Sequence, residues 1–291
     1  MSTTVGIIGL GLLGGSMAKA LRAFTDYEVI GYARRQEVCD AALLDGCVSS
    51  ASTDVTDIIE NSHIVVFALP PDRNAKLFTE TAHLFRPGMV VTDVSSAKRN
   101  FVKAVYNAIP EGVRFVSIHP MAGSERGGFE MTTKELFRHT TWIVLDDPIR
   151  ACWSEQVAQE LSNMGRAFGA RVIHVLLEEH DDYLASVSHM PHLMAATVAV
   201  VGGGGEDGTF RMQLAAGGFR DVTRICAGNP SMWREILRGN REAVLRELTE
   251  VETQVARLKK LLVADDEGRG LEEYLRKAKA IRDTFTELMV K

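Results

Sequence analysis

The chain has 291 residues, 46% of them hydrophobic and 24% charged, which is typical of a folded protein with room for two domains. Its formal net charge of −5 argues against a protein that coats nucleic acid or an anionic membrane. The four cysteines show no metal-ligand spacing, so we expect free thiols in a reducing cytoplasm and no metal site. No apolar run approaches the ~20 residues of a membrane span and no signal peptide is visible, so we expect no membrane partner.

The first 175 residues alternate between short apolar runs and helical patterns. This alternation predicts strands separated by helices, and runs that are apolar on both faces favour a parallel sheet covered on each side. The predicted strands are 5–8, 28–32, 64–69, 89–93, 114–118, 141–145 and 171–175, and the predicted helices in this part are 12–24, 38–44 and 97–109.

The pattern changes near residue 170. Residues 178–201 predict one long helix that ends at four glycines, and 232–263 and 271–289 predict two more helices. Leucines and valines between 245 and 262 recur at near-heptad spacing, which indicates a core or a dimer seam. The sequence therefore predicts an α/β fold, with a Rossmann-type parallel-sheet domain at 1–170 and an all-α domain at 171–291.

A glycine-rich fingerprint, Gly9-Leu-Gly-Leu-Leu-Gly14, lies between the first predicted strand and helix. In that context the first glycine permits a tight turn, the second lets the backbone approach a pyrophosphate, and the third lets the helix pack on the strand. The alternative is a glycine-rich turn without a ligand. We expect a nucleotide cofactor to contact Gly9, Leu10, Gly11, Leu12, Leu13, Gly14, Leu69 and Pro70.

The end of the second predicted strand bears on the choice of cofactor. NAD-specific sheets place Asp or Glu there for the ribose hydroxyls, whereas this chain has Ala33 followed by Arg34 and Arg35. Two guanidinium groups would attract the 2′-phosphate of NADP and can bind it bidentately. We therefore expect NADP to be preferred, with NAD as the other candidate; the alternative is that both arginines are merely solvated.

The segment from His119 to Phe129, HPMAGSERGGF, places a histidine among proline and small residues. This composition predicts a titratable group on a loop, at the point in the chain where a nucleotide-binding sheet would finish. An imidazole with a reference pKa of ~6.5 is available as a base at neutral pH. His119 is therefore the candidate base for hydride chemistry.

Six motifs occur in order along the chain: GLGLLGGS, DVSSAK, HPMAGSE, HDDYLASVSHMPH, GGFRDVTR and NPSMWREI. Together they resemble the prephenate and arogenate dehydrogenases of tyrosine biosynthesis. The resemblance implies a nucleotide-binding domain followed by a helical domain that forms a homodimer. It also implies a small cyclohexadienol substrate, which is oxidised and decarboxylated as a hydride passes to NAD(P).

The resemblance also implies roles for individual residues. His119 would accept the proton of the substrate hydroxyl, Ser96 would orient His119 or that hydroxyl, and Arg224 would bind a substrate carboxylate. His189 and His192 would approach the side-chain end of the substrate, Ser124 and Glu125 would shape the pocket mouth, and Asp221 would support Arg224. Each has a structural alternative: core packing for the two helix histidines, and a helix N-cap for Ser96.

Other functions remain open. Prephenate and arogenate differ by a keto or an amino group, and no residue here separates them, so prephenate is the main reading and arogenate the alternative. A β-hydroxyacid or imine-type dehydrogenase would need a lysine on the long interdomain helix, and 178–201 contains none. A non-catalytic cofactor-binding protein would not need His119, Ser96 and Arg224 together.

Overall fold

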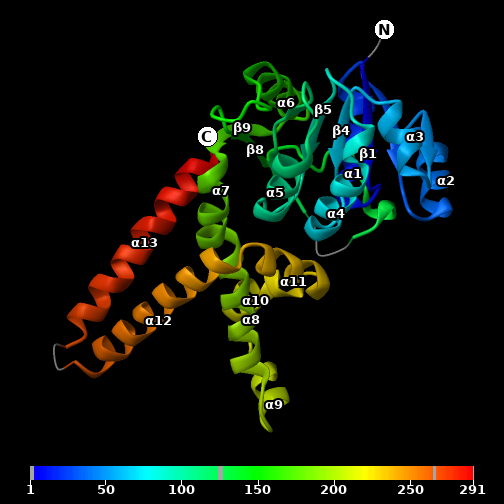
Figure 1. The fold of residues 1–291 in the computed structure, drawn as a ribbon. Coiled ribbons are helices and arrows are strands. Elements are labelled where there is room, and N and C mark those ends of the chain that lie inside the picture. Colours follow the sequence, from blue (N-terminus) through cyan, green and yellow to red (C-terminus); the bar gives the residue numbers. More distant parts are fainter. Residues whose placement is uncertain (1–2, 124–126, 265–266, 291) are drawn as a thin grey trace. The chain divides into compact units, whose positions relative to one another are not determined.

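The computed structural model describes residues 3–123, 127–264 and 267–290. The chain divides into two compact units, Met1–Arg241 and Glu242–Lys291. The first unit contains two β-sheets and the helices packed on them, followed by a series of helices from α7, which begins at Leu177, to α11, which ends at Gly239 (Figure 1).

The larger sheet is parallel, and its described strands have the order β3-β2-β1-β4-β5-β6. This order is that of a dinucleotide-binding Rossmann fold, so the predicted fold class is confirmed. The strands are β1 (Thr4–Ile8), β2 (Glu28–Tyr32), β3 (Ser50–Ser52), β4 (Ile64–Phe67), β5 (Val90–Asp93) and β6 (Arg114–Phe115). The helices between them are α1 (Leu12–Phe24), α2 (Gln36–Asp45), α3 (Val55–Glu60), α4 (Pro71–Thr81) and α5 (Arg99–Ala108).

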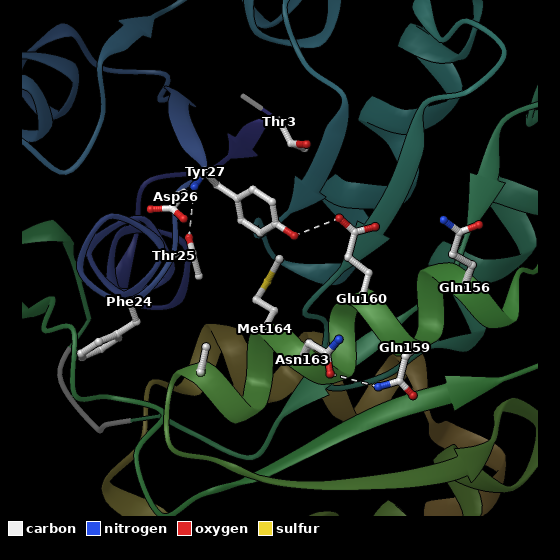
Figure 2. Close-up of a pocket in the computed structure, with 11 residues that line it drawn as sticks. Thr3, Phe24, Thr25, Asp26, Tyr27, Gln156, Gln159, Glu160, Asn163 and Met164 are labelled. Atoms are coloured by element: carbon white, nitrogen blue, oxygen red, sulfur yellow. Dashed lines mark hydrogen bonds between the residues drawn. The ribbon is translucent and has the colours of Figure 1, made fainter. Parts of the chain in front are cut away.

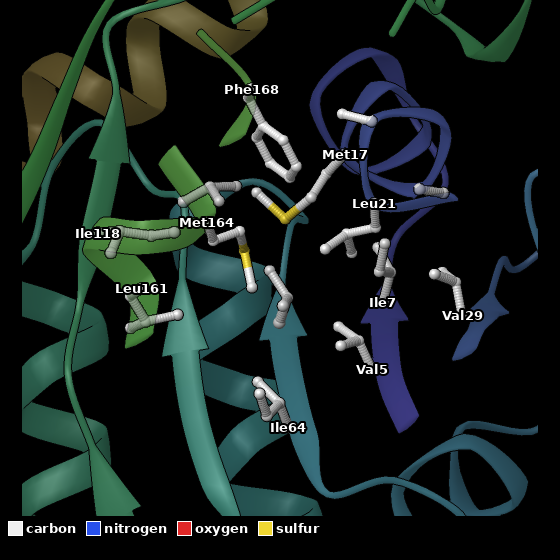
Figure 3. Close-up of a cluster of buried hydrophobic side chains, with 14 of the residues drawn as sticks. Val5, Ile7, Met17, Leu21, Val29, Ile64, Ile118, Leu161, Met164 and Phe168 are labelled. Carbon is white, nitrogen blue, oxygen red and sulfur yellow. The ribbon is translucent and has the colours of Figure 1, made fainter. Parts of the chain in front are cut away.

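Both faces of this sheet are buried because successive strand residues point to opposite sides. In β4, Ile64 and Val66 join one hydrophobic cluster, whereas Val65 and Phe67 join another. The first cluster includes residues of α1 and of α6 (Glu155–Ala167), and the second includes residues of α3, α4 and α5. Figure 3 shows the first cluster, in which side chains of α1 and α6 meet over the strands.

The smaller sheet contains β7 (Ile118–Pro120), β8 (Thr141–Asp146) and β9 (Arg171–Leu176). β7 is antiparallel to β8, and β9 is parallel to it. The predicted strand 114–118 is therefore wrong as a single element: the chain leaves the large sheet after Phe115 and enters the small one at Ile118. β9 follows the predicted domain boundary at 170 and still pairs with β8; the division at 170 stays a prediction.

The first unit continues as one helical rod from α7 (Leu177–Leu184) through a π-helical turn (Ala185–His189) into α8 (Met190–Gly203). This helix is 27 residues long. An 18-residue window within it has a mean hydropathy of 1.4, and 28% of that window is buried. By length and composition alone it could cross a membrane, but a single such helix is weak evidence because core helices pass the same test, so the expectation of no membrane partner stays a prediction. Shorter helices follow: α9 (Gly208–Gln213), α10 (Gly217–Thr223), a 3₁₀ turn (Arg224–Ala227) and α11 (Pro230–Gly239).

The second unit consists of two long helices, α12 (Arg241–Val263) and α13 (Arg269–Val290). The predicted helix 232–263 is therefore two helices, with the break at Asn240 (φ −116°, ψ 31°). Within this unit the guanidinium of Arg257 lies 5.5 Å from the ring centroid of Tyr274. Large apolar side chains are exposed along both helices: Leu245, Val255, Leu262, Leu275, Ile281, Phe285 and Leu288.

Candidate active site

The loop between β1 and α1 has the geometry of a pyrophosphate cradle. Gly9 has φ +111°, and a Cβ atom there would lie 2.7 Å from Leu69. A Cβ on Gly14 would lie 2.0 Å from the carbonyl oxygen of Gly9, whereas one on Gly11 would meet nothing within 4 Å. α1 begins directly after Gly11 without a side-chain cap, which leaves its first amides for an anion. The loop therefore fits a dinucleotide phosphate group.

The apolar residues of the predicted cofactor site surround this loop. Leu10 is buried against Gly31 of β2, and Leu12 and Leu13 are half-buried at the start of α1. Leu69 is held by Asn74, whose amide accepts the Leu69 N–H at 3.0 Å and donates to its carbonyl at 2.9 Å. Pro70 is exposed and precedes α4.

The end of β2 carries no acidic side chain that could hold a ribose hydroxyl. Ala33 is buried and donates its N–H to Ser52, while Arg34 and Arg35 are both exposed in the turn before α2. This arrangement leaves two guanidinium groups free to reach a ligand in solvent.

His119 lies in β7, paired with Ile143, so the prediction that it sits on a loop is wrong. Proline is tolerated next to it because β7 is short and ends at Pro120. The side chain is 5% exposed. Burial, followed by the charges of His180 and Lys98, holds the pKa of His119 well below its usual range. His119 is therefore a neutral imidazole at pH 7, able to accept a proton.

The Nδ1 atom of His119 lies 2.9 Å from Nε2 of His180, which is on α7. The two rings meet edge to face, with centroids 5.1 Å apart. Nδ1 of His180 is in turn 2.8 Å from a carboxylate oxygen of Asp181. Burial lowers the pKa of His180, although its hydrogen bond with Asp181 opposes this. A carboxylate and two imidazoles thus form one buried hydrogen-bonded chain.

The carboxylate of Asp181 also caps the amino end of α5. It accepts the backbone N–H of Lys98 at 3.0 Å and that of Arg99 at 3.1 Å. Burial alone would raise the pKa of Asp181, but the hydrogen bonds from His180 and the two amides outweigh it and lower the pKa. Asp181 therefore stays ionised at neutral pH.

Lys98 connects this chain to the large sheet. The residue is 1% exposed, and its ammonium group donates to Asp93 at 3.0 Å and to the carbonyl oxygen of Ile118 at 2.6 Å. The hydroxyl of Ser117 donates to the same carboxylate. Burial lowers the pKa of Lys98, and the charge of Asp93 opposes that shift. Because Ile118 precedes His119, the buried ion pair fixes the strand that carries the imidazole.

His189 is the last residue of the π-helical turn and His192 lies in the first turn of α8, and both are buried. Nδ1 of His189 lies 3.1 Å from the amide nitrogen of Asn240, which also donates to the backbone oxygen of Asp181. Burial lowers the pKa of His189 to about 4. His192 is stacked on Trp233, with centroids 3.5 Å apart and planes 12° apart.

His192 is also tied to the turn that holds Arg224. Burial lowers its pKa, opposed by a hydrogen bond to the backbone of Ile225, the residue after Arg224. Its Nδ1 is buried and has no hydrogen-bond partner among the described residues. The guanidinium of Arg224 is exposed, and Asp221 forms an ion pair with Arg220 at 3.1 Å. The roles of His189, His192, Arg224 and Asp221 toward a substrate stay predictions.

Ser96 is half-buried between β5 and α5. It is not the N-cap of α5, which begins at Arg99 with Lys98 as the capping residue, so that alternative is wrong. The partner observed at Nδ1 of His119 is His180; a role for Ser96 at the substrate hydroxyl stays a prediction. The predicted pocket residues Ser124 and Glu125 lie outside the described residues.

Several residues of this arrangement are not among the predicted site residues: Asp93, Lys98, His180, Asp181, Trp233 and Asn240. The strongest available signal was the pair His180-Asp181 within HDDYLASVSHMPH, where a histidine and a carboxylate precede the two other helix histidines. Asp93 and Lys98 are five residues apart in DVSSAK and could have been expected to meet at the end of one strand.

A cavity of about 880 Å³ lies far from this chemistry in the fold (Figure 2). It is lined at the amino ends of β1 and β2, whereas the fingerprint loop follows the carboxyl end of β1. In it, the hydroxyl of Tyr27 donates to Glu160 at 2.9 Å, and burial followed by this bond raises the pKa of Tyr27 to about 12. Ligands of doubly wound sheets bind at the carboxyl ends, so this cavity is not the candidate active site.

Comparison with known proteins shows the family of the chain. Residues 17–174 match the model described as "Prephenate dehydrogenase, nucleotide-binding domain", and residues 177–277 match "Prephenate dehydrogenase, dimerization domain". A prephenate dehydrogenase of Bacillus subtilis is 29% identical over 97% of this chain and 76% of its own length. A cyclohexadienyl dehydrogenase of Zymomonas mobilis is 29% identical over 96% of this chain and 94% of its own.

A solved structure shares this fold. The prephenate dehydrogenase of A. aeolicus, in complex with hydroxyphenyl propionate and NAD+, aligns with a TM-score of 0.87 and 27% identity. The alignment covers 98% of this chain and 99% of that one. The chain therefore belongs to the prephenate dehydrogenase family, the NAD(P)-dependent oxidoreductases of tyrosine biosynthesis.

Proposed function

We propose that this chain oxidises prephenate, with loss of CO₂, to 4-hydroxyphenylpyruvate. The observation that carries the proposal is His119: a buried, neutral imidazole whose Nδ1 is already hydrogen-bonded, in a chain of this family with an intact phosphate-binding loop. Its Nε2 is the ring nitrogen left for a substrate hydroxyl.

In this reaction a hydride leaves the ring carbon that bears the hydroxyl, and a proton leaves the oxygen of the same hydroxyl. When bound, the nicotinamide supplies the hydride acceptor. His119 accepts the hydroxyl proton at Nε2 as the carbonyl forms. The bond to the ring carboxylate then breaks, its electron pair aromatises the ring and returns charge to the oxygen, and His119 gives the proton back. Arg224 binds a substrate carboxylate, and His192 contacts the side-chain end.

Initial rates with prephenate and arogenate, each paired with NAD+ and NADP+, test this function. We expect turnover with prephenate, and a fall in kcat of at least ~1,000-fold in His119→Asn with little change in cofactor affinity. The exposed His83→Asn is the matched control and should keep wild-type kcat. Preference for arogenate would assign the alternative substrate, and no reduced nicotinamide from either compound would overturn the proposal.

We also propose that NADP+ is preferred over NAD+. The support is the pair of exposed guanidinium groups of Arg34 and Arg35 where an acidic residue would favour NAD+. Arg34→Ala should raise the KM for NADP+ about tenfold and leave that for NAD+ within about twofold, since a charged contact contributes ~1–2 kcal/mol. Equal kcat/KM values for both cofactors in the wild type would contradict this preference.

We further propose a cytoplasmic homodimer built on the helical region. The match of 177–277 to a dimerization domain supports it, as do exposed apolar side chains on α8 and α9, such as Val200, Val201 and Phe210, at 72%, 70% and 62% exposed. The four cysteines are all free thiols, which suits a reducing compartment.

A further inference from the structure

We propose that His180 and Asp181 are positioning residues of this reaction, which hold the proton of His119 on Nδ1 and so keep Nε2 as the acceptor for the substrate hydroxyl. The proposal rests on the proposed function, because it assigns the atom through which His119 acts. His180 and Asp181 do not touch the substrate in this scheme.

The assignment follows from what each group can donate. The Asp181 carboxylate only accepts hydrogen bonds, so the His180 nitrogen 2.8 Å away, Nδ1, must carry its proton. Buried His180 is neutral, so its other nitrogen, Nε2, is then an acceptor. The Nδ1 of His119, 2.9 Å from that nitrogen, must therefore be the donor. Only the Nε2 lone pair of His119 is left for a substrate proton.

The geometry maintains this order of donors because Asp181 cannot readily become neutral. Its carboxylate oxygens accept hydrogen bonds from the backbone N–H groups of Lys98 and Arg99, at the positive end of α5. They also accept one from the ring of His180. Its backbone oxygen accepts the amide of Asn240. Three donors therefore hold the carboxylate in its charged form, and Asn240 holds the backbone that carries it.

Other charged groups around the two imidazoles favour the same neutral, ordered state. Lys98 lies close enough to lower the pKa of both His119 and His180. His189 lowers the pKa of His119 further, and Asp93 and Asp181 act in the opposite direction on His180. Neither ring carries a second proton at neutral pH before substrate binds.

The proton balance is simple under this assignment. The hydroxyl proton moves to Nε2 of His119 as the carbonyl forms, and the Nδ1 proton stays donated to His180. The transient positive charge faces the Asp181 carboxylate through the His180 ring. The same proton returns to the product oxygen after CO₂ leaves, so the chain ends in its starting state.

Asp181→Asn tests the assignment directly. The Asn oxygen would take over the two α5 amides, so its NH₂ group would face His180 and donate to Nδ1. That reverses every donor in the chain and places the proton of His119 on Nε2. We expect kcat to fall at least ~100-fold, with KM for prephenate and cofactor within about threefold, as for other catalytic imidazoles held in the wrong tautomer.

The tautomer itself is measurable apart from activity. In protein labelled with ¹⁵N-histidine, His119 should show a protonated Nδ1 in the wild type and a protonated Nε2 in Asp181→Asn. The exposed pair His174 and Asp146 is a matched control, with Nδ1 of His174 3.0 Å from a carboxylate oxygen. Asp146→Asn should change neither kcat nor the His119 signals.

The outcomes separate the two proposals. If His119→Asn keeps wild-type kcat, the proposed function of His119 fails. If His119→Asn is inactive but folded Asp181→Asn keeps wild-type kcat or an unchanged His119 tautomer, only the positioning proposal is overturned. Should Asp181→Asn not fold, His180→Phe decides: it removes the acceptor at His119 Nδ1, so kcat should fall at least ~100-fold, and wild-type kcat would overturn the proposal.

Discussion

The sheet region and the helical region that follows it bury their apolar side chains in different ways. In the sheet region, alternate residues of each central strand enter two separate cores, and Val65, Val66 and Phe67 are all completely buried. In the helical region, Val200, Phe210 and Leu214 are 72%, 62% and 72% exposed. The first region completes its cores within one chain, whereas the second leaves large apolar side chains exposed in the single chain.

The candidate site joins the two regions through polar contacts, beside a small apolar cluster in which Leu184 of α7 packs with Ile143 and Leu145 of β8. His119 comes from a strand, and His180 and Asp181 come from the first turn of the helical rod. Buried hydrogen bonds require defined partners and distances, whereas apolar packing tolerates small shifts. The comparison therefore predicts large energetic effects at the polar connection and small ones on the exposed helical surface.

Lys98→Met should have the largest effect on stability. It leaves the buried Asp93 carboxylate without its ammonium partner and the Ile118 carbonyl without its donor. We expect a loss of about 3–5 kcal/mol in the free energy of unfolding, measured by urea denaturation. The control is Lys76→Met, in an exposed pair with Glu80, which should change it by less than about 0.5 kcal/mol. A similar small change for both variants would show that the ion pair does not hold the strand.

His189 should make the free energy of unfolding depend on pH, with an effect smaller than that of Lys98→Met. Its pKa is about 4 in the folded chain and ~6.5 unfolded, so between these values the unfolded chain binds more protons. Stability is then full above pH 6.5 and falls as the pH drops toward 4, by up to ~3 kcal/mol from this residue. Unfolding of His189→Gln at pH 7.5 and 5 should show a shallower fall than wild type. An unchanged slope would contradict the prediction.

Phe210→Ser should have the smallest effect on the fold of the protomer. Because the ring is mostly exposed, the free energy of unfolding of the protomer should change by less than about 0.5 kcal/mol. Under the proposed homodimer, the same variant should shift sedimentation toward the monomer at low concentration. Leu44→Ser, which removes an apolar side chain 92% exposed on α2, should not change assembly. Equal behaviour of the two variants would remove the distinction between the regions.

Sequence periodicity recovered β1, β2, β4 and β5 because each is an apolar run bounded by turns, but it missed β3, whose residues Ser50–Ser52 form no apolar run. It missed α4, whose first residues, Pro71 and Asp72, look like a turn, although proline is well suited to the first turn of a helix. It also joined α11 to α12, because a break at one buried asparagine, Asn240, interrupts no apolar stripe. Such breaks depend on hydrogen bonds to distant residues and leave no periodic trace.

The sequence by itself determined the Rossmann fold, the glycine loop and the family, because these depend on residues that are neighbours in the chain. His119 was also found from its motif, but its partners were not. His119 and His180 are 61 residues apart, and they meet only because the chain crosses from the large sheet to the small one before β7. Only the tertiary structure decided which nitrogen of His119 is held, because a hydrogen bond of 2.9 Å depends on where both backbones run.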